Sequence, residues 1–208
     1  MPSGAVRARW SLLLGTLLWT AAIAAGLVGL WRYDFKRGAA AAVPDYAAFA
    51  DEAGRAGDQA HLVMLAHPRC PCTRASIAEL ARLMAQAPGR LVADVYFVQP
   101  PGTADDFVET DLWQSAAAIP GVRVWRDRDG RAAARFGAET SGQVVLFDAA
   151  GRRRFQGGIT AARGHEGDNA GRAAVLAALD GDAPADTPVF GCGLGNAPSG
   201  SEERPCPM

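Results

Sequence analysis

The chain has 208 residues, with 21 basic and 22 acidic side chains and a formal net charge of -1 at pH 7. Because the two signs nearly balance, no bulk field directs the protein to nucleic acid or anionic lipid, and we expect no nucleic-acid partner. Once an apolar N-terminus and a Pro- and Gly-rich C-terminus are set aside, roughly 140 residues remain, the ordinary size of one domain. The chemistry is therefore expected in a local site of that domain.

The first predicted element is a membrane-spanning helix. Residues 10–30, WSLLLGTLLWTAAIAAGLVGL, carry no charge, and about 20 apolar residues in a helix span a hydrocarbon layer of roughly 30 Å. Trp10 and Trp31 mark its ends, as aromatic residues do at membrane interfaces. The apolar run exceeds the roughly 7–15 residues typical of a cleaved signal peptide. We therefore interpret residues 1–33 as an uncleaved transmembrane anchor, followed by a linker over residues 34–45.

The predicted domain, residues 46–181, alternates helices and strands. Short continuous apolar runs predict buried strands, and apolar residues at helical spacing predict helices. The expected elements are a helix over 46–54, a strand over 61–66, a helix over 73–84, a strand over 91–98, a helix over 111–118, an extended piece over 122–125, a helical turn over 130–136, a hairpin of strands 144–148 and 153–156, and a helix over 169–179. This order indicates an α/β fold with a mixed central sheet covered on both faces. Residues 182–208 are predicted to be an irregular tail, of which 189–192 could dock on the domain.

A cysteine pair lies where the first predicted strand gives way to a helix. The segment HPRCPC, residues 67–72, contains two prolines and cannot be regular structure. A helix N-terminus favours a thiolate, and so do nearby positive charges. Cys70 and Cys72 are therefore the candidate catalytic pair, and a disulfide between them is expected to be strained and relatively oxidising. The candidate supporting residues are His67, Arg69, Arg74 and His165.

Other roles for the cysteines stay open at this point. The pair could be structural, with Cys192 and Cys206 as partners in two ordinary disulfides. Cys192 could instead resolve a disulfide with Cys70, or pair with Cys206, because four cysteines allow three complete pairings.

The histidines suggest a metal site as the alternative. His61 begins a strand and is expected at the surface or an edge. His67 could tune a thiolate, bind metal or be structural, and His165 could be a base or ligand, or a loop residue beside an Asp168 or Asn169 helix cap. Soft thiolates and imidazole suit copper(I) or zinc. The alternative ligand set is His67, Cys70, Cys72, His165 and Cys192.

These motifs resemble a known group. The order of strand, cysteine turn and amphipathic helix, with the later hairpin, looks like the membrane-anchored thioredoxin-like proteins. Residues 67–76, HPRCPCTRAS, and 157–169, GGITAARGHEGDN, are similar to the small group of RedB proteins. The resemblance, over about residues 46–194, implies a thioredoxin-like three-layer sandwich on an anchor in the inner (cytoplasmic) membrane, with the domain facing the periplasm.

The chain also departs from the usual thioredoxin pattern. Matching Cys70-Pro71-Cys72 to Cys-Gly-Pro-Cys puts Cys72 at the second cysteine, Arg69 at the first, and Cys70 at the glycine. The loop that usually carries a cis-proline reads TSGQ over residues 140–143. In the family that proline shapes the substrate groove and keeps metals off the cysteines, so its loss leaves metal binding more open. A peroxiredoxin pattern is not matched around Cys70.

Two functions follow as hypotheses. The first is a membrane-anchored, periplasm-facing thiol-disulfide oxidoreductase that needs no cofactor and acts on protein thiols and disulfides. In it Cys70 attacks a disulfide and Cys72 resolves the mixed disulfide. The alternative is a copper- or zinc-handling module on the same fold.

Overall fold

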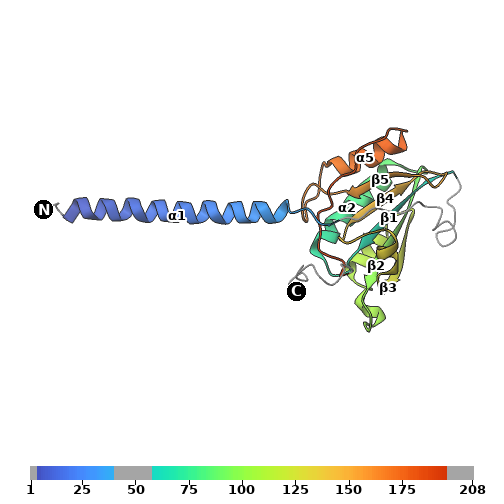
Figure 1. Ribbon diagram of the computed structural model, residues 1–208, viewed down its shortest axis with the longest axis horizontal. Helices are drawn as coiled ribbons and strands as arrows, with labels where there is room; N and C mark the ends of the chain where they lie inside the picture. The colour runs from blue at the N-terminus through green and yellow to red at the C-terminus, as the bar shows by residue number, and fades with distance from the viewer. Residues whose placement is uncertain (1–3, 40–57, 196–208) are drawn as a thin grey trace. The chain divides into compact units, whose positions relative to one another are not determined.

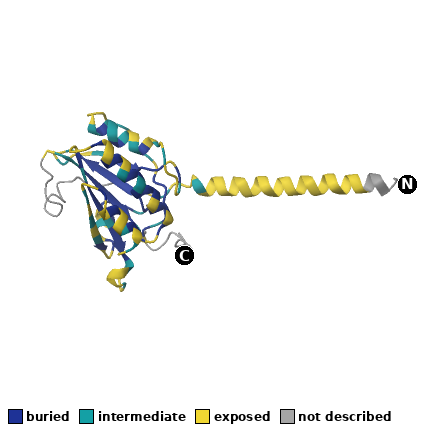
Figure 2. Ribbon diagram, turned by 180° about the vertical axis from the view of Figure 1, so that it is seen from behind, coloured by how far each residue is buried: buried dark blue, intermediate teal, exposed yellow. Residues whose placement is uncertain are grey.

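The computed structural model describes residues 4–39 and 58–195, which belong to two compact units (Figure 1). The first unit, Met1–Lys36, holds one helix, α1, Gly4–Asp34. From Ala8 onward α1 has 27 residues, and an 18-residue window within it has a mean hydropathy of 2.0. The side chains of residues 8–34 are almost all exposed (Figure 2). The predicted helix of membrane-spanning length is therefore present.

The second unit is built on a five-stranded sheet in the order β3-β2-β1-β4-β5. Strands β1, β2 and β3 run parallel, whereas β4 is antiparallel to β1 and β5 to β4. The elements in chain order are β1 Ala60–Ala66, α2 Pro71–Gln86, β2 Leu91–Gln99, the 3-10 helix η2 Asp105–Phe107, α3 Asp111–Ala117, β3 Val122–Arg128, α4 Arg131–Arg135, β4 Gln143–Phe147, β5 Arg153–Gly158 and α5 Ala170–Leu179. The expected α/β, thioredoxin-like arrangement with a mixed central sheet is confirmed.

Alternating side chains of β1 supply the two faces of the core. Leu62 and Met64 belong to the larger hydrophobic cluster, which includes side chains of α2, α3 and α5. Val63 and Leu65 belong to a second cluster, with residues from α4 and its C-terminal end. Because successive residues of a strand point to opposite faces, a strand with apolar residues at every position must be covered on both sides. Figure 2 shows the resulting buried sheet between partly exposed helices.

Most predicted elements of the domain are confirmed within a few residues. The predicted helix over 46–54 lies outside the described residues. Strand β3 is longer than the expected piece over 122–125, because it pairs with β2 through Gln99↔Arg128. Asn169 caps α5 as expected, since its side chain accepts a hydrogen bond from the Arg172 N–H.

The expectation that His61 lies at the surface is wrong. Its side chain is buried, and its Nε2 lies 2.7 Å from Oδ2 of Asp94 on β2. Asp94 is fully buried and also accepts hydrogen bonds from Arg123 and from the Trp125 indole N–H. A buried carboxylate needs such partners, and His61 is buried because it is one of them.

The tail docks on the domain over residues 189–194. The segment from Asp182 to Gly195 forms no helix or strand, as expected, yet Val189, Phe190, Cys192 and Leu194 are buried. Glycines make the close approach possible. A Cβ on Gly191 would lie 2.0 Å from the backbone oxygen of Ser141, closer than atoms can approach.

Candidate functional site

The cysteine turn joins the end of β1 to the start of α2. Cys70 is the N-cap residue of α2, in extended conformation, and Pro71 occupies the first turn. Proline suits this position because its fixed φ fits the helix and its missing N–H would have no partner there. The Cys70 N–H donates to the His67 oxygen at 3.3 Å, which tightens the turn. The prediction that the cysteines lie on a strand-to-helix turn is confirmed.

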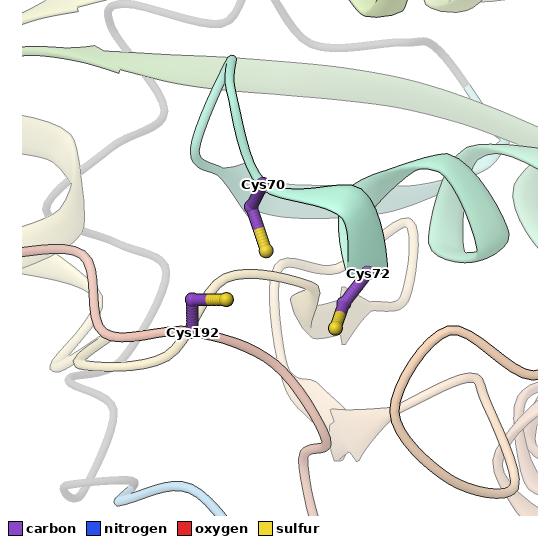
Figure 3. A group of neighbouring side chains, drawn as sticks. All are labelled: Cys70, Cys72 and Cys192. Carbon is purple, nitrogen blue, oxygen red and sulfur yellow. The ribbon is translucent and has the colours of Figure 1, made fainter. Parts of the chain in front are cut away.

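Three cysteine sulfurs meet at this turn. The Sγ atoms of Cys70, Cys72 and Cys192 all lie within 4.8 Å of one another. Figure 3 shows the three side chains pointing into a shared space, two from the turn and one from the tail. All three residues are buried, and Cys70 is only 1% exposed. Cys70 and Cys72 are free thiols, whereas Cys192 is disulfide-bonded.

Hydrogen bonds shift the pKa values of the Cys70 and Cys72 thiols in opposite directions. The pKa of Cys70 is lowered from its ordinary 9.0 to about 6, chiefly by a hydrogen bond from the Cys72 thiol and despite burial. The backbone N–H groups of Cys192, Thr73 and Cys72 add to the lowering. The pKa of Cys72 is raised because its thiol proton is held by Cys70, and burial raises it further. Cys70 is therefore the thiolate at neutral pH, and Cys72 holds the proton.

The loop before β4 holds the cysteine turn through hydrogen bonds. The Ser141 hydroxyl accepts a hydrogen bond from the His67 N–H at 2.9 Å and shares one of 2.8 Å with the Thr73 hydroxyl. The next residue, Gly142, donates its N–H to the Leu65 oxygen at 2.8 Å. Its φ of +89° suits glycine, and a Cβ there would lie 2.7 Å from Ser76 Oγ. No cis peptide bond occurs among the described residues. In this loop Ser141 and Gly142 make the hydrogen bonds that hold the cysteine turn.

The tail runs antiparallel to the same loop. The Ser141 N–H donates to the Cys192 oxygen, and the Leu194 N–H donates to the Glu139 oxygen, both at 2.8 Å. Thr140 and Gly193 form an antiparallel bridge between them. This pairing fixes the position of Cys192 over Cys70.

Three of the predicted supporting residues, His67, Arg69 and Arg74, lie on the turn or just after it, but the two arginine side chains make their contacts elsewhere. The Arg69 guanidinium lies over the Phe107 ring, 4.5 Å from its centroid, and Arg74 pairs with Asp111 at the surface. His67 Nδ1 accepts a hydrogen bond from the Arg69 N–H at 3.2 Å, and its pKa is lowered by burial and then by the Arg69 charge. Hydrogen bonds, rather than the expected arginine charges, dominate the acidity of Cys70.

His165 is exposed, and its Nδ1 lies 2.8 Å from the Arg163 oxygen. Among the described residues, the one group of clustered ligand atoms contains sulfur alone. Neither His67 nor His165 contributes a ring nitrogen to it. The structure thus brings together the three cysteines of the alternative metal set and not the two histidines.

A second loop, residues 159–169, reaches Cys72 through Arg163 and Gly164, which belong to the segment of the RedB resemblance but had been assigned no role of their own. The Gly164 N–H hydrogen-bonds the Cys72 sulfur, and the Arg163 charge acts on it, both in the direction that lowers the Cys72 pKa. Glu79 of α2 holds this loop. Its buried carboxylate accepts hydrogen bonds from the Gly167 N–H at 2.7 Å, from Asn169 and from Arg172. A glutamate within the apolar pattern of α2 was the available signal.

Two solved structures with TM-scores above 0.5 share the fold of this chain. No protein-family profile and no curated protein matches the sequence. A hypothetical protein of Sinorhizobium meliloti is 25% identical, with a TM-score of 0.53, over 76% of this chain and 92% of that one. An uncharacterised conserved protein of Geobacillus kaustophilus is 18% identical, with a TM-score of 0.56, over 77% and 90%. A secreted disulfide oxidoreductase of Mycobacterium tuberculosis, homologous to DsbE of E. coli, is 13% identical, with a TM-score of 0.41, over 61% and 84%.

The strand order, the helices on both faces and the thiol pair at the start of α2 agree on one description. This chain is a thioredoxin-like α/β domain with a Cys70-Pro71-Cys72 site, preceded by one helix long and apolar enough to span a membrane.

Proposed function

We propose that the protein is a thiol-disulfide oxidoreductase of protein thiols and disulfides. The observation that carries the proposal is the pair of free, buried thiols at the start of α2, whose sulfurs lie within 4.8 Å of each other. The hydrogen bond between them lowers the pKa of Cys70 and raises that of Cys72, which favours Cys70 as the thiolate. A thiolate attacks disulfides, and its proton-bearing neighbour is the group that can resolve the product. The proposal keeps the roles that the sequence analysis gave to Cys70 and Cys72.

The reaction has two exchanges. The Cys70 thiolate attacks one sulfur of a partner disulfide, forms a mixed disulfide and releases the other partner sulfur as a thiolate. Cys72 then loses its proton and attacks the Cys70 sulfur. This step forms a Cys70–Cys72 disulfide and releases the second partner thiolate, so two electrons pass from the protein to its partner. A disulfide within so short a turn is expected to be relatively oxidising, which makes the reverse direction accessible as well.

The test is turnover of a protein disulfide by the full chain in detergent. Cys70→Ser should lower the rate on the order of a thousandfold or more, because it removes the nucleophile itself. Cys72→Ser should still form a mixed disulfide with the partner but fail to release it. Ala185→Val, an exposed change in the tail, is the control. Undiminished turnover by Cys70→Ser would end the proposal.

We place the domain on the periplasmic side of the inner (cytoplasmic) membrane, as the resemblance to the anchored RedB group suggests. Helix α1 supplies a segment of sufficient length and hydropathy. The disulfide at Cys192 supports an oxidising compartment, since disulfides persist there and are rare in the cytosol. Protease added outside spheroplasts should digest the domain of the full chain and spare a cytoplasmic marker. Protection of the domain would contradict this placement.

Metal handling is the second candidate, favoured by the gathering of three sulfurs within 4.8 Å. Copper(I) and zinc bind thiolates. Cys70 and Cys72 offer two, and Cys192 would offer a third after reduction of its disulfide. The full chain, reduced and exposed to copper(I) or zinc, should then retain about one ion per chain, and lose it when Cys70 and Cys72 are both replaced by serine. A reduced chain that retains none would exclude this function.

A further inference from the structure

Cys192 lies directly against the Cys70 sulfur. The Cys192 N–H donates a hydrogen bond to that sulfur, and the two Sγ atoms lie within 4.8 Å. Cys70 is 1% exposed, so its attack on a partner disulfide requires the docked tail to move first. A disulfide sulfur of the chain itself is already within reach.

The tail is held as an extended peptide is held at a sheet edge. Two backbone hydrogen bonds of 2.8 Å and the Thr140–Gly193 bridge join it to the loop before β4. Main-chain pairing of this kind fixes register, so it determines which tail residue faces the cysteine turn. That residue is Cys192, flanked by Gly191, whose missing Cβ lets the tail lie against Ser141.

We propose that Cys192 is a third redox cysteine, which exchanges its disulfide with Cys70 inside the chain. The inference rests on the proposed thiol-disulfide function and deepens it by naming an internal exchange partner. The Cys70 thiolate attacks the Cys192 sulfur, a Cys70–Cys192 bond forms, and the sulfur previously bonded to Cys192 leaves as a thiolate. The tail disulfide is the oxidant and Cys70 the reductant, so atoms and electrons balance without another reagent.

The positions of the other groups suit this exchange. The Cys72 sulfur lies within 4.8 Å of both Cys70 and Cys192, so it can attack the new bond at Cys70 and release Cys192. The sequence has one further cysteine, Cys206, which lies outside the described residues. The tail would thus carry an oxidising equivalent into the buried site, or carry one away from it.

The experiment maps disulfides in the full chain in detergent across a glutathione redox series. Free thiols are trapped by alkylation, and the linked peptides are identified by mass after digestion without reductant. In Cys72→Ser, or Cys72→Ala should the serine variant not fold, the Cys70–Cys192 pair should accumulate. The original Cys192 disulfide should be lost in equal amount, with one newly alkylated thiol for each pair formed.

Gly191→Val, which moves the tail off the loop, should abolish the Cys70–Cys192 pair when combined with the Cys72 change, whereas Ala185→Val should preserve it. A Cys192 disulfide unchanged throughout the series, with Cys70 present only as thiol or glutathione adduct, would overturn the inference. That outcome leaves the proposed function standing if wild-type protein still turns over a partner disulfide. Loss of that turnover is the separate failure of the proposed function.

Discussion

The two segments that bring sulfur to the site are positioned in different ways. The turn over residues 67–73 is local: a buried strand ends, proline starts a helix, and Cys70 lies at the N-cap. The tail over residues 189–194 reaches the same place through contacts far along the chain with the loop before β4. Local sequence therefore determines which element carries a thiol. Distant contacts decide how buried it is and which groups donate hydrogen bonds to it.

The largest expected effect concerns Glu79, whose network holds the loop that reaches Cys72. In Glu79→Ala the partly buried partners Arg172, Asn169 and the Gly167 N–H lose their shared, fully buried acceptor. The free energy of unfolding should fall by about 3 kcal/mol, because these groups lose a fully buried charged acceptor, although Arg172 keeps its contact with Asp168. Denaturant unfolding of the full chain in detergent measures it.

The matched control for that change is Glu166→Ala. Glu166 pairs with Arg82 at the surface, where both side chains are over 40% exposed, and exposed pairs contribute about 1 kcal/mol or less. Equal losses in the two variants would show that the Glu79 network does not stabilise the loop as described.

The next effect separates the tail from the turn. Gly191→Val places a side chain where only a hydrogen fits, so the tail should leave the loop and expose Cys70. The alkylation rate of Cys70 should rise about tenfold or more, as expected when a local opening of roughly 1.4 kcal/mol is no longer required. Ala185→Val should leave the rate near that of wild type. An unchanged rate in Gly191→Val would mean that the tail does not cover the thiol.

The smallest effect lies inside the turn. Cys72→Ala removes the thiol that makes the largest contribution to the low Cys70 pKa, whereas the backbone N–H donors remain. The pH midpoint of Cys70 alkylation should move from about 6 part of the way toward 9.0. Cys72→Ser, which keeps a hydroxyl donor, should move it less. Identical midpoints in the three proteins would contradict the assigned hydrogen bond.

The lowered pKa of Cys70 also makes the free energy of unfolding depend on pH. The fold favours the Cys70 thiolate, so this contribution to the free energy of unfolding is complete above pH 9.0 and is lost as pH falls through about 6. The effect should be absent in Cys70→Ser, which gives the control for a pH series.

Sequence patterns predicted the parts of the protein that depend on short stretches of chain. Residues 61–66 and 91–98 are apolar at almost every position, so their burial on both faces followed directly, and the proline turn placed Cys70 and Cys72 on it. The docking of residues 189–192 was foreseen only as an option. What made it definite, the close approach of Gly191 to Ser141, is a contact between segments 50 residues apart, and no local pattern encodes it.

The roles of charged residues were harder to predict, because their contacts also lie far along the chain. Arg69 stands next to Cys70 in the sequence, yet its side chain turns to Phe107, which follows another strand. Arg163 is far away in sequence and acts on Cys72. His61 looked like an edge residue until the buried Asp94 of the neighbouring strand gave it a partner. Electrostatic roles depend on which side chains the fold places together.

The central claim is that Cys70 and Cys72 form one reversible redox couple, and thiol trapping of the wild-type full chain tests it most directly. The chain in detergent is equilibrated across a glutathione redox series, alkylated and analysed by mass. The account predicts that both thiols disappear together and reversibly as the buffer becomes more oxidising. Two thiols that stay alkylatable across the whole series would contradict it.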